Sequence, residues 1–297
     1  MSPPDDADSE VVLADLALTR AITIQMTALG TLGVVVAWAL FSAVYQFGVG
    51  TPPTFRFVPA SVGWWTDALN LVVLLLLGTV FVVPHEWLHG LVIRYYGGEV
   101  RYGVGVAHFI LPYAYATSDH EFSRNQFVVI LLTPLVVMTA VGVPLMLGFE
   151  WGWLVVPLAA NAAGAIADLW MTLQLLSYPA YVRLEDHETG VRILGRASDR
   201  PRSLSVTAVV WDALSGAAIA AIGVLVLLAV GGPILLSALG IESLTLGTPG
   251  TITYLFAFVN TPEEISMGVG PGVLGVGALV GLVYAFARSH RRARRVV

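Results

Sequence analysis

The residues of this chain with the most specific chemical pattern are His85-Glu86-Trp87-Leu88-His89, an H-E-x-x-H motif inside an apolar stretch. Residues four apart on a helix lie on nearly one face, so the two imidazoles can bind one metal ion while Glu86 lies beside them. Zinc held in this way lowers the pKa of its water ligand toward about 7, and a neighbouring carboxylate can take up the proton. The motif therefore predicts a hydrolytic zinc centre with His85 and His89 as ligands and Glu86 as catalytic base.

The apolar surroundings of the motif favour a functional role for its charged residue. An ionisable group at the centre of a membrane-spanning helix costs about 2.5–3.5 kcal/mol by insertion scales, and such groups usually mark a functional site. The same residues could also bind a metal for transport or for structure, without catalysis. The motif leaves this non-enzymatic metal-binding membrane protein as the alternative hypothesis.

A third metal ligand must come from elsewhere in the chain. A catalytic zinc normally has three protein ligands, and the sequence contains no cysteine. The position that an extended H-E-x-x-H-x-x-G-x-x-H motif would use is Tyr95. Asp168 is the best candidate. Asp168 and His85 each fall roughly 24 Å from the outer end of their predicted spans at about 1.5 Å per residue, so the two side chains would lie at the same depth and could meet. Asn161, seven residues before Asp168, is predicted on the same helix face, where its amide could bind substrate or support a ligand.

Other acidic and histidine residues compete for this third position. Asp212, in a later apolar segment, is the chief alternative to Asp168, and it could also support the site from outside the ligand set. His108, His120 and Glu121 follow the motif and would reach the metal only if their segment folds back. We expect these three to be solvated loop residues.

The composition predicts that these residues lie in a membrane protein. Of the 297 residues, 57% are hydrophobic and only 12% are charged, against about 25% charged in ordinary soluble domains. Several stretches approach the roughly 20 apolar residues that a helix needs to cross a bilayer. We predict six spans, at residues 23–47, 68–93, 127–148, 152–178, 204–231 and 270–288.

The arginines predict how the chain is oriented in the membrane. All 15 basic residues are arginine, and if the N-terminus is cytoplasmic, all except Arg56 fall in cytoplasmic segments. This asymmetry is what the positive-inside rule requires of an even number of spans. We therefore expect an integral protein of a prokaryotic plasma membrane with both termini in the cytoplasm. Residues 1–20 are predicted to be an acidic cytoplasmic tail and residues 21–297 a single membrane domain.

The predicted partners follow from this location. The clustered arginines are expected to set the topology and to contact anionic lipid headgroups, and nothing else in the sequence favours nucleic-acid binding. A membrane protein or peptide is the expected substrate. The sequence carries no signal for the oligomeric state.

The predicted fold class is an all-α polytopic bundle of six transmembrane helices. Between the second and third spans, apolar residues alternate with others over residues 100–107, which predicts a short β-hairpin or re-entrant strand. Residues 232–268 contain several helix-breaking residues and no arginine. We expect an external loop there, with a short interfacial helix.

With these motifs, the chain resembles the putative zincin peptidases of the membrane, a family similar in plan to the site-2 proteases. The resemblance covers roughly residues 70–180 and rests on His85-Glu86-x-x-His89-Gly90 in one span and on Asn161 with Asp168 in a later one. The latter pair falls where site-2 proteases carry an N-x-x-P-x-x-x-L-D-G element, although it is one residue closer together here and has neither the proline nor the glycine. The resemblance implies zinc bound by His85, His89 and Asp168, Glu86 as catalytic base, and substrates cleaved in or near the bilayer.

Overall fold

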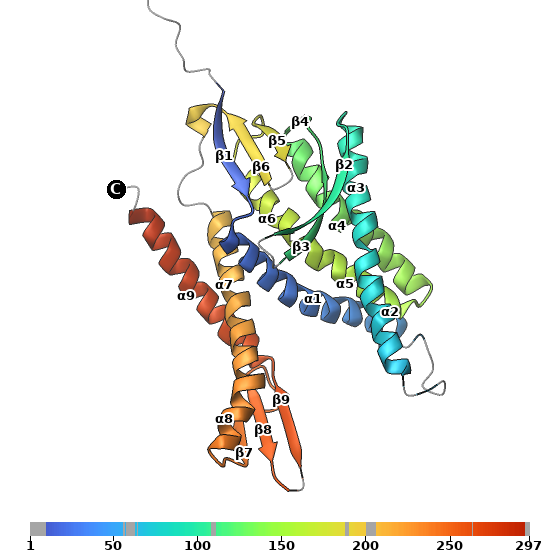
Figure 1. Ribbon diagram of the computed structural model, residues 1–297, viewed down its shortest axis with the longest axis vertical. Helices are drawn as coiled ribbons and strands as arrows, with labels where there is room; N and C mark the ends of the chain where they lie inside the picture. The colour runs from blue at the N-terminus through green and yellow to red at the C-terminus, as the bar shows by residue number, and fades with distance from the viewer. Residues whose placement is uncertain are drawn as a thin grey trace, which may run out of the picture. The chain divides into compact units, whose positions relative to one another are not determined.

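The structure is a computed structural model that describes residues 10–55, 57, 63, 65–107, 111–187, 190–199, 206–262 and 264–294 (Figure 1). The chain divides into two compact units, Met1–Pro201 and Arg202–Val297, and each is described by itself. The grouping of all spans into a single membrane domain stays a prediction.

The six predicted spans are found as six helical segments that are long and apolar enough to cross a membrane. Their limits agree with the predicted spans to within about seven residues. The segments are Arg20–Val49, Thr66–Tyr95, Arg124–Gly148, Gly152–Leu175, Val206–Ala238 and Gly272–Arg294. The first four belong to the first unit.

Two of these segments in the first unit are interrupted helices. The second consists of α2 (Thr66–Val80) and α3 (Val82–Tyr95), and the fourth consists of a 3-10 turn (Gly152–Leu154), α5 (Val155–Gly164) and α6 (Ile166–Leu175). The first and third are the continuous helices α1 (Arg20–Val49) and α4 (Arg124–Gly148). The interruptions lie at Phe81 and Ala165, which are four residues before His85 and three residues before Asp168 respectively.

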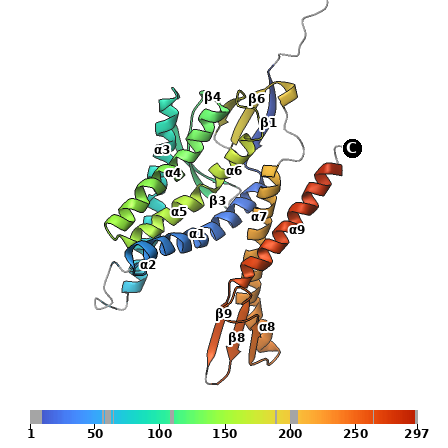
Figure 2. The same ribbon diagram turned by 180° about the vertical axis from the view of Figure 1, so that it is seen from behind.

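The fourth segment forms the interior of the first unit. In its most apolar window 56% of the residues are buried, compared with 11–28% in the other five segments. Helix α1 packs closely against it, because Gly33 lies next to Ala163, and Phe41 and Leu158 share an apolar core. Helices α3, α4 and α5 lie side by side (Figure 2). The segment that carries Asn161 and Asp168 is therefore surrounded by other helices.

The first unit also contains two β-sheets, which corrects the prediction of an all-α fold. Antiparallel strands β1 (Val11–Ala17), β6 (Gly190–Gly195), β5 (Arg183–His187) and β4 (Glu121–Ser123) form one sheet in that order. Its apolar residues pack against the ends of α3 and α4, and the shared core includes Ile93, Phe122, Phe127, Leu184 and Ile193. The segment 11–17, expected within an acidic tail, is thus an edge strand of a sheet.

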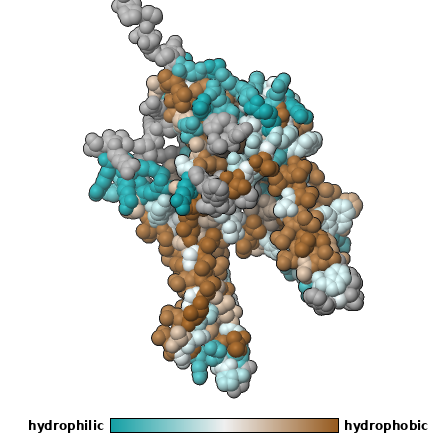
Figure 3. Space-filling view, viewed as in Figure 1, coloured by the Kyte–Doolittle hydropathy of each residue, from teal (hydrophilic) through white to brown (hydrophobic). Residues whose placement is uncertain are grey.

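The edge strand β1 is held to the sheet by an ion pair as well as by backbone hydrogen bonds. Glu10, just before β1, pairs with Arg183 of β5. The hydrogen-bonded guanidinium holds the pKa of the Glu10 carboxyl below its usual value. The polar surface over this sheet contrasts with the apolar surface of α2 in Figure 3.

The predicted hairpin after the second span is confirmed. Strands β2 (Arg101–Ala107) and β3 (Leu111–Thr117) pair with each other in register Arg101↔Thr117 to Ala107↔Leu111. The glycine on β2 gives the Tyr115 ring room, since a Cβ at Gly103 would lie 2.4 Å from that ring and the ring would have to shift. Within the described residues the hairpin forms a two-stranded sheet of its own.

The second unit consists of a helical pair and a small sheet. Helix α7 (Val206–Val226) continues through a π-helical turn (Leu227–Gly231) into α8 (Gly232–Ala238), and α9 (Gly272–Arg294) ends the unit. Strands β7 (Ser243–Leu246), β8 (Phe256–Asn260) and β9 (Ile265–Val269) form an antiparallel sheet in that order. The prediction of a loop over 232–268 is therefore wrong for the strands, and residues 232–238 form α8, which continues the span-length helix that begins at Val206.

Candidate metal centre

The interruptions in the second and fourth segments place the candidate ligands near helix starts. Helix α3 begins at Val82, and the His85 N–H bonds to the Phe81 carbonyl at 3.3 Å across the interruption. Asp168 lies in the first turn of α6. A carboxylate is favoured there, because the first turn of a helix carries unpaired N–H groups and the positive end of the helix dipole.

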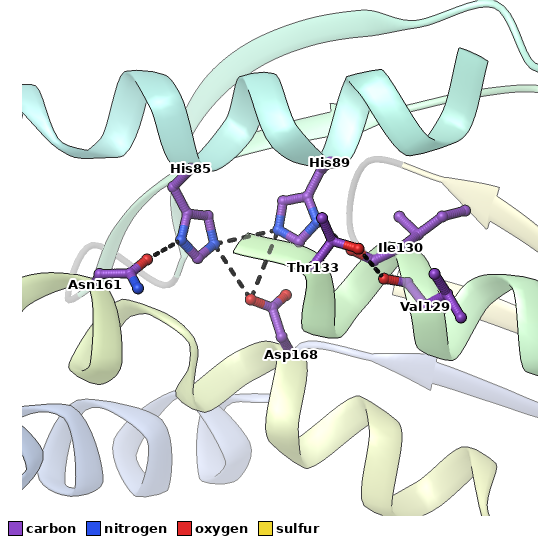
Figure 4. A network of polar contacts seen from close by, with 7 residues as sticks. All are labelled: His85, His89, Val129, Ile130, Thr133, Asn161 and Asp168. Atoms are coloured by element: carbon purple, nitrogen blue, oxygen red, sulfur yellow. Dashed lines mark hydrogen bonds and ion pairs between the residues drawn. The ribbon is translucent and has the colours of Figure 1, made fainter. Parts of the chain in front are cut away.

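Three side-chain atoms from these helices converge on one point (Figure 4). His85 and His89 lie one turn apart on α3, both buried, and their Nε2 atoms are 3.2 Å apart. The Asp168 Oδ2 atom lies 3.3 Å from Nε2 of His85 and 3.6 Å from Nε2 of His89. Among the described residues, these three form a group able to hold a metal ion.

The other nitrogen of each imidazole has a hydrogen-bond acceptor. His85 Nδ1 lies 2.9 Å from Asn161 Oδ1, and His89 Nδ1 lies 2.8 Å from the Ile130 carbonyl oxygen. A carbonyl oxygen can only accept, so Nδ1 carries a proton in both rings, and a metal ion that displaces any proton from Nε2 would find a lone pair there. Metal-binding histidines commonly have their tautomer set by such a partner.

These distances fit a zinc ion. With zinc–ligand distances of about 2.0–2.1 Å and tetrahedral angles, two ligand atoms should lie about 3.4 Å apart. The three separations between Nε2 of His85, Nε2 of His89 and Oδ2 of Asp168 are 3.2, 3.3 and 3.6 Å. Two lone pairs and a carboxylate oxygen facing one another repel unless a proton or a metal ion lies between them. Two nitrogens and one oxygen are also a donor set that zinc accepts in catalytic sites.

Glu86 lies beside this donor set and is not one of its members. It follows His85 on α3, is half-buried and interacts electrostatically with both His85 and His89. Within the described part of the chain its carboxylate forms no hydrogen bond. It can therefore accept a proton from a water molecule at the metal centre.

Residues 78–183 match the model of the family described as putative zincin peptidase. The matched segment runs from the end of α2 to the start of β5 and contains the three candidate ligands, Glu86 and Asn161. The family description suggests a metallopeptidase and implies zinc. The chain has no match among curated proteins or solved structures.

Asn161 lies in the segment that matches the family model, where its amide bonds to a candidate ligand. Its Oδ1 atom accepts the hydrogen bond from His85, as Figure 4 shows. Its Nδ2 atom is buried and has no hydrogen-bond partner among the described residues. One half of this side chain thus orients a ligand, and the other half is a donor without an acceptor.

Asp212, the alternative third ligand, lies outside the segment that matches the family model and has other partners. It is 1% exposed on α7, and its two carboxylate oxygens lie 3.1 Å from Arg288 Nη1 and 2.8 Å from Arg292 Nη1. Both arginines belong to α9. The structure therefore gives this carboxylate a role in joining α7 to α9 within the second unit.

The remaining alternatives are also accounted for. Glu121 on β4 forms an ion pair with Arg183 at 3.0 Å, and His120 lines a surface pocket together with Glu99 and Asp119. His108 lies outside the described residues. None of the described alternatives joins the group of His85, His89 and Asp168.

Sequence reasoning missed the part played by Ile130 of α4. Its side chain is buried and apolar, and only its backbone carbonyl contacts the centre, through Nδ1 of His89. A backbone oxygen has no signature in residue type. The one signal in the sequence is Pro134, four residues later, which lacks the N–H that this carbonyl would otherwise accept.

Proposed function

We propose that this chain is an integral membrane zinc metallopeptidase that hydrolyses peptide bonds of membrane-associated polypeptides. The observation that carries the proposal is the spacing of Nε2 of His85, Nε2 of His89 and Oδ2 of Asp168 at the edge lengths of a zinc tetrahedron. The family match of residues 78–183 adds support that does not depend on these distances.

The roles of the side chains follow from this arrangement. Zinc held by His85, His89 and Asp168 would supply a Lewis acid that polarises the scissile carbonyl and makes a water molecule more acidic. The Glu86 carboxylate takes the proton from the attacking water and then delivers it to the nitrogen of the leaving amine. The hydrogen bonds at Nδ1 keep both imidazoles oriented throughout, because they do not involve the metal-binding nitrogens.

Membrane insertion is supported by the apolar surface of the helices. Large apolar side chains such as Val35, Leu75 and Leu279 are more than half exposed on helices that are long enough to span a bilayer. Such a surface is stable in lipid and not in water. With the arginine distribution, this supports a plasma-membrane protein with six spans, both termini cytoplasmic and anionic lipid as a partner.

We propose further that the substrate binds as an extended strand beside the β2–β3 hairpin. A helix hides its peptide bonds, whereas an unpaired sheet edge offers hydrogen bonds to an extended segment. Gly90, next to His89, lies against Tyr102 of β2, so the hairpin is adjacent to the ligand-bearing helix.

Photo-cross-linking tests this substrate position. A photoreactive residue at Val104, which is 84% exposed on β2, should cross-link membrane proteins that accumulate in cells producing an inactive variant. The same group at Leu279, 66% exposed on α9 of the second unit, provides the control. Equal products from both positions would exclude a substrate strand at the hairpin.

Three variants test the metallopeptidase itself. Glu86→Gln should retain zinc and abolish cleavage, since the amide cannot accept the proton of water. Asp168→Ala should lose both zinc and cleavage, while Asp212→Asn should keep both. Zinc is measured by metal analysis of the purified protein, and cleavage by mass spectrometry of new protein termini in membranes of producing cells.

The same experiment separates the proposal from a metal site without catalysis. If Glu86→Gln membranes contained the same protein termini as wild-type membranes while both proteins bound zinc, the centre would be structural or would serve transport. If zinc were retained in Asp168→Ala but lost from Asp212→Asn, the third ligand would be Asp212 and not Asp168.

A further inference from the structure

The hydrogen bond that orients His89 uses a backbone carbonyl in the middle of a helix. Ile130 lies in the second turn of α4, and its carbonyl oxygen is 2.8 Å from His89 Nδ1. In an uninterrupted α-helix that oxygen would accept the N–H of the residue four positions later. A carbonyl that accepts this helical N–H points along the helix axis, so it is poorly placed to accept a hydrogen bond from a second donor.

The residue four positions after Ile130 is Pro134. Proline has no backbone N–H, and its ring pushes against the carbonyl of the residue four positions earlier. The Ile130 oxygen is thereby left without its helical donor and is tilted away from the axis. Pro134 is itself buried in α4. Proline is the least favourable residue in a helix interior, and at this position the carbonyl that it frees has another donor, Nδ1 of His89.

We propose that Pro134 is a positioning residue of the metal centre, which acts by withholding an N–H from the Ile130 carbonyl. The carbonyl then accepts the Nδ1 proton of His89, which holds that ring with the lone pair of Nε2 directed at His85 and Asp168. This inference rests on the metal centre of the proposed function and is independent of the reaction catalysed there.

Another proline in the same helix provides a matched control. Pro144 also lies inside α4, and the carbonyl that it frees belongs to Ala140. Within the described part of the chain, no side chain bonds to that carbonyl. Replacing either proline restores one helical hydrogen bond, but only the replacement of Pro134 restores a competitor for the acceptor of His89.

Zinc affinity, measured by chelator competition on the full chain in detergent, tests the proposal. Pro134→Ala and Pro134→Val both restore the N–H and should weaken zinc binding by about 10-fold or more, as the loss of an outer hydrogen bond to a metal ligand does. Pro144→Ala should bind zinc as wild type does. Thermal unfolding should show that every variant still folds cooperatively, because each new residue is a better helix former than proline.

The two substitutions at Pro134 separate hydrogen bonding from packing. Valine is close to proline in size, so a defect seen with alanine but not with valine would come from a cavity and would overturn the proposal. Unchanged zinc affinity in both variants would also overturn it. Wild-type protein that binds no zinc would instead overturn the metal centre itself.

A second measurement reports on the hydrogen bond directly. In zinc-loaded protein labelled with 15N-histidine, the Nδ1–H of wild-type His89 should give a downfield proton signal that exchanges slowly with water, because the proton is bonded to a buried carbonyl oxygen. Both Pro134 variants should move this signal upfield or speed its exchange, and Pro144→Ala should not. A His89 signal that is identical in wild type and Pro134 variants would contradict the inference.

Discussion

At the scale of single residues, the metal centre is built from a small number of polar side chains in an apolar interior. Asn161 is one of these, and it serves a ligand through one atom only. Its Oδ1 accepts from His85, while Nδ2 is buried without a hydrogen-bond partner among the described residues. A replacement that keeps the oxygen therefore loses no existing hydrogen bond.

Substitution of Asn161 should separate these two atoms. Asn161→Leu removes the acceptor and should weaken zinc binding by about 10–100-fold. Asn161→Asp keeps an oxygen acceptor and should retain zinc, because a carboxylate that accepts from a zinc-bound histidine is a common arrangement. Metal content and chelator competition measure both variants. Equal zinc affinity of Asn161→Leu and wild type would show that this hydrogen bond does not support the ligand.

The histidine pair and the acidic partner were predictable to different degrees. The spacing of His85 and His89 is local, so helix geometry alone brings the two rings together. Asp168 was found only by comparing depths in two predicted spans, which required the arginine-based topology as well. Ile130 could not be found from residue type, because its contribution comes from the backbone.

At the scale of elements, the contact between α3 and the β2–β3 hairpin depends on Gly90. A Cβ at this position would lie 2.0 Å from the Tyr102 hydroxyl oxygen and 3.0 Å from a methyl group of Val100. The glycine therefore allows the hairpin to pack directly beside His89. Gly78, in the same helical segment, has no such neighbour within 4 Å.

These two glycines give a matched pair of substitutions. Gly90→Ala should destabilise the protein by about 1–3 kcal/mol, as overpacking usually does, and should reduce cleavage because the hairpin must move. Gly78→Ala should be neutral or slightly stabilising, since alanine is the better helix former. Thermal unfolding and the terminus analysis described above measure both. A second substitution, Tyr102→Ala, should partly restore Gly90→Ala, and failure to do so would exclude this contact as the cause.

The strands show where element prediction failed. The hairpin at 101–117 was predictable because its two strands are adjacent and its alternation is regular. Strand β1 pairs with β6, whose residues come more than 170 positions later, and no local pattern reports such pairing. Strands β7, β8 and β9 have only four or five residues each, so the glycines and prolines around them were interpreted as a loop.

At the scale of the whole molecule, the spans were the most predictable feature. Each needs about 20 apolar residues, a signal that outweighs local propensity. The six helical segments lie close to their predicted positions, whereas their arrangement as one bundle stays a prediction. The orientation in the membrane depends on a separate signal, the near absence of arginine from the predicted external segments.

The absence of cysteine makes this orientation directly testable, since single cysteines can be introduced without first removing others. Ala197→Cys and His290→Cys, in exposed positions predicted to be cytoplasmic, should react with a membrane-impermeant maleimide only in inverted vesicles. Thr51→Cys and Thr248→Cys, exposed in segments predicted to be external, should react in intact cells.

The positive-inside rule requires this pattern, because translocating the arginine-rich segments would oppose their attraction to the anionic cytoplasmic leaflet. Labelling of Ala197→Cys in intact cells would show that the orientation is opposite to the predicted one. Labelling of Thr51→Cys and Thr248→Cys from opposite sides would instead show that the number of spans between them is odd.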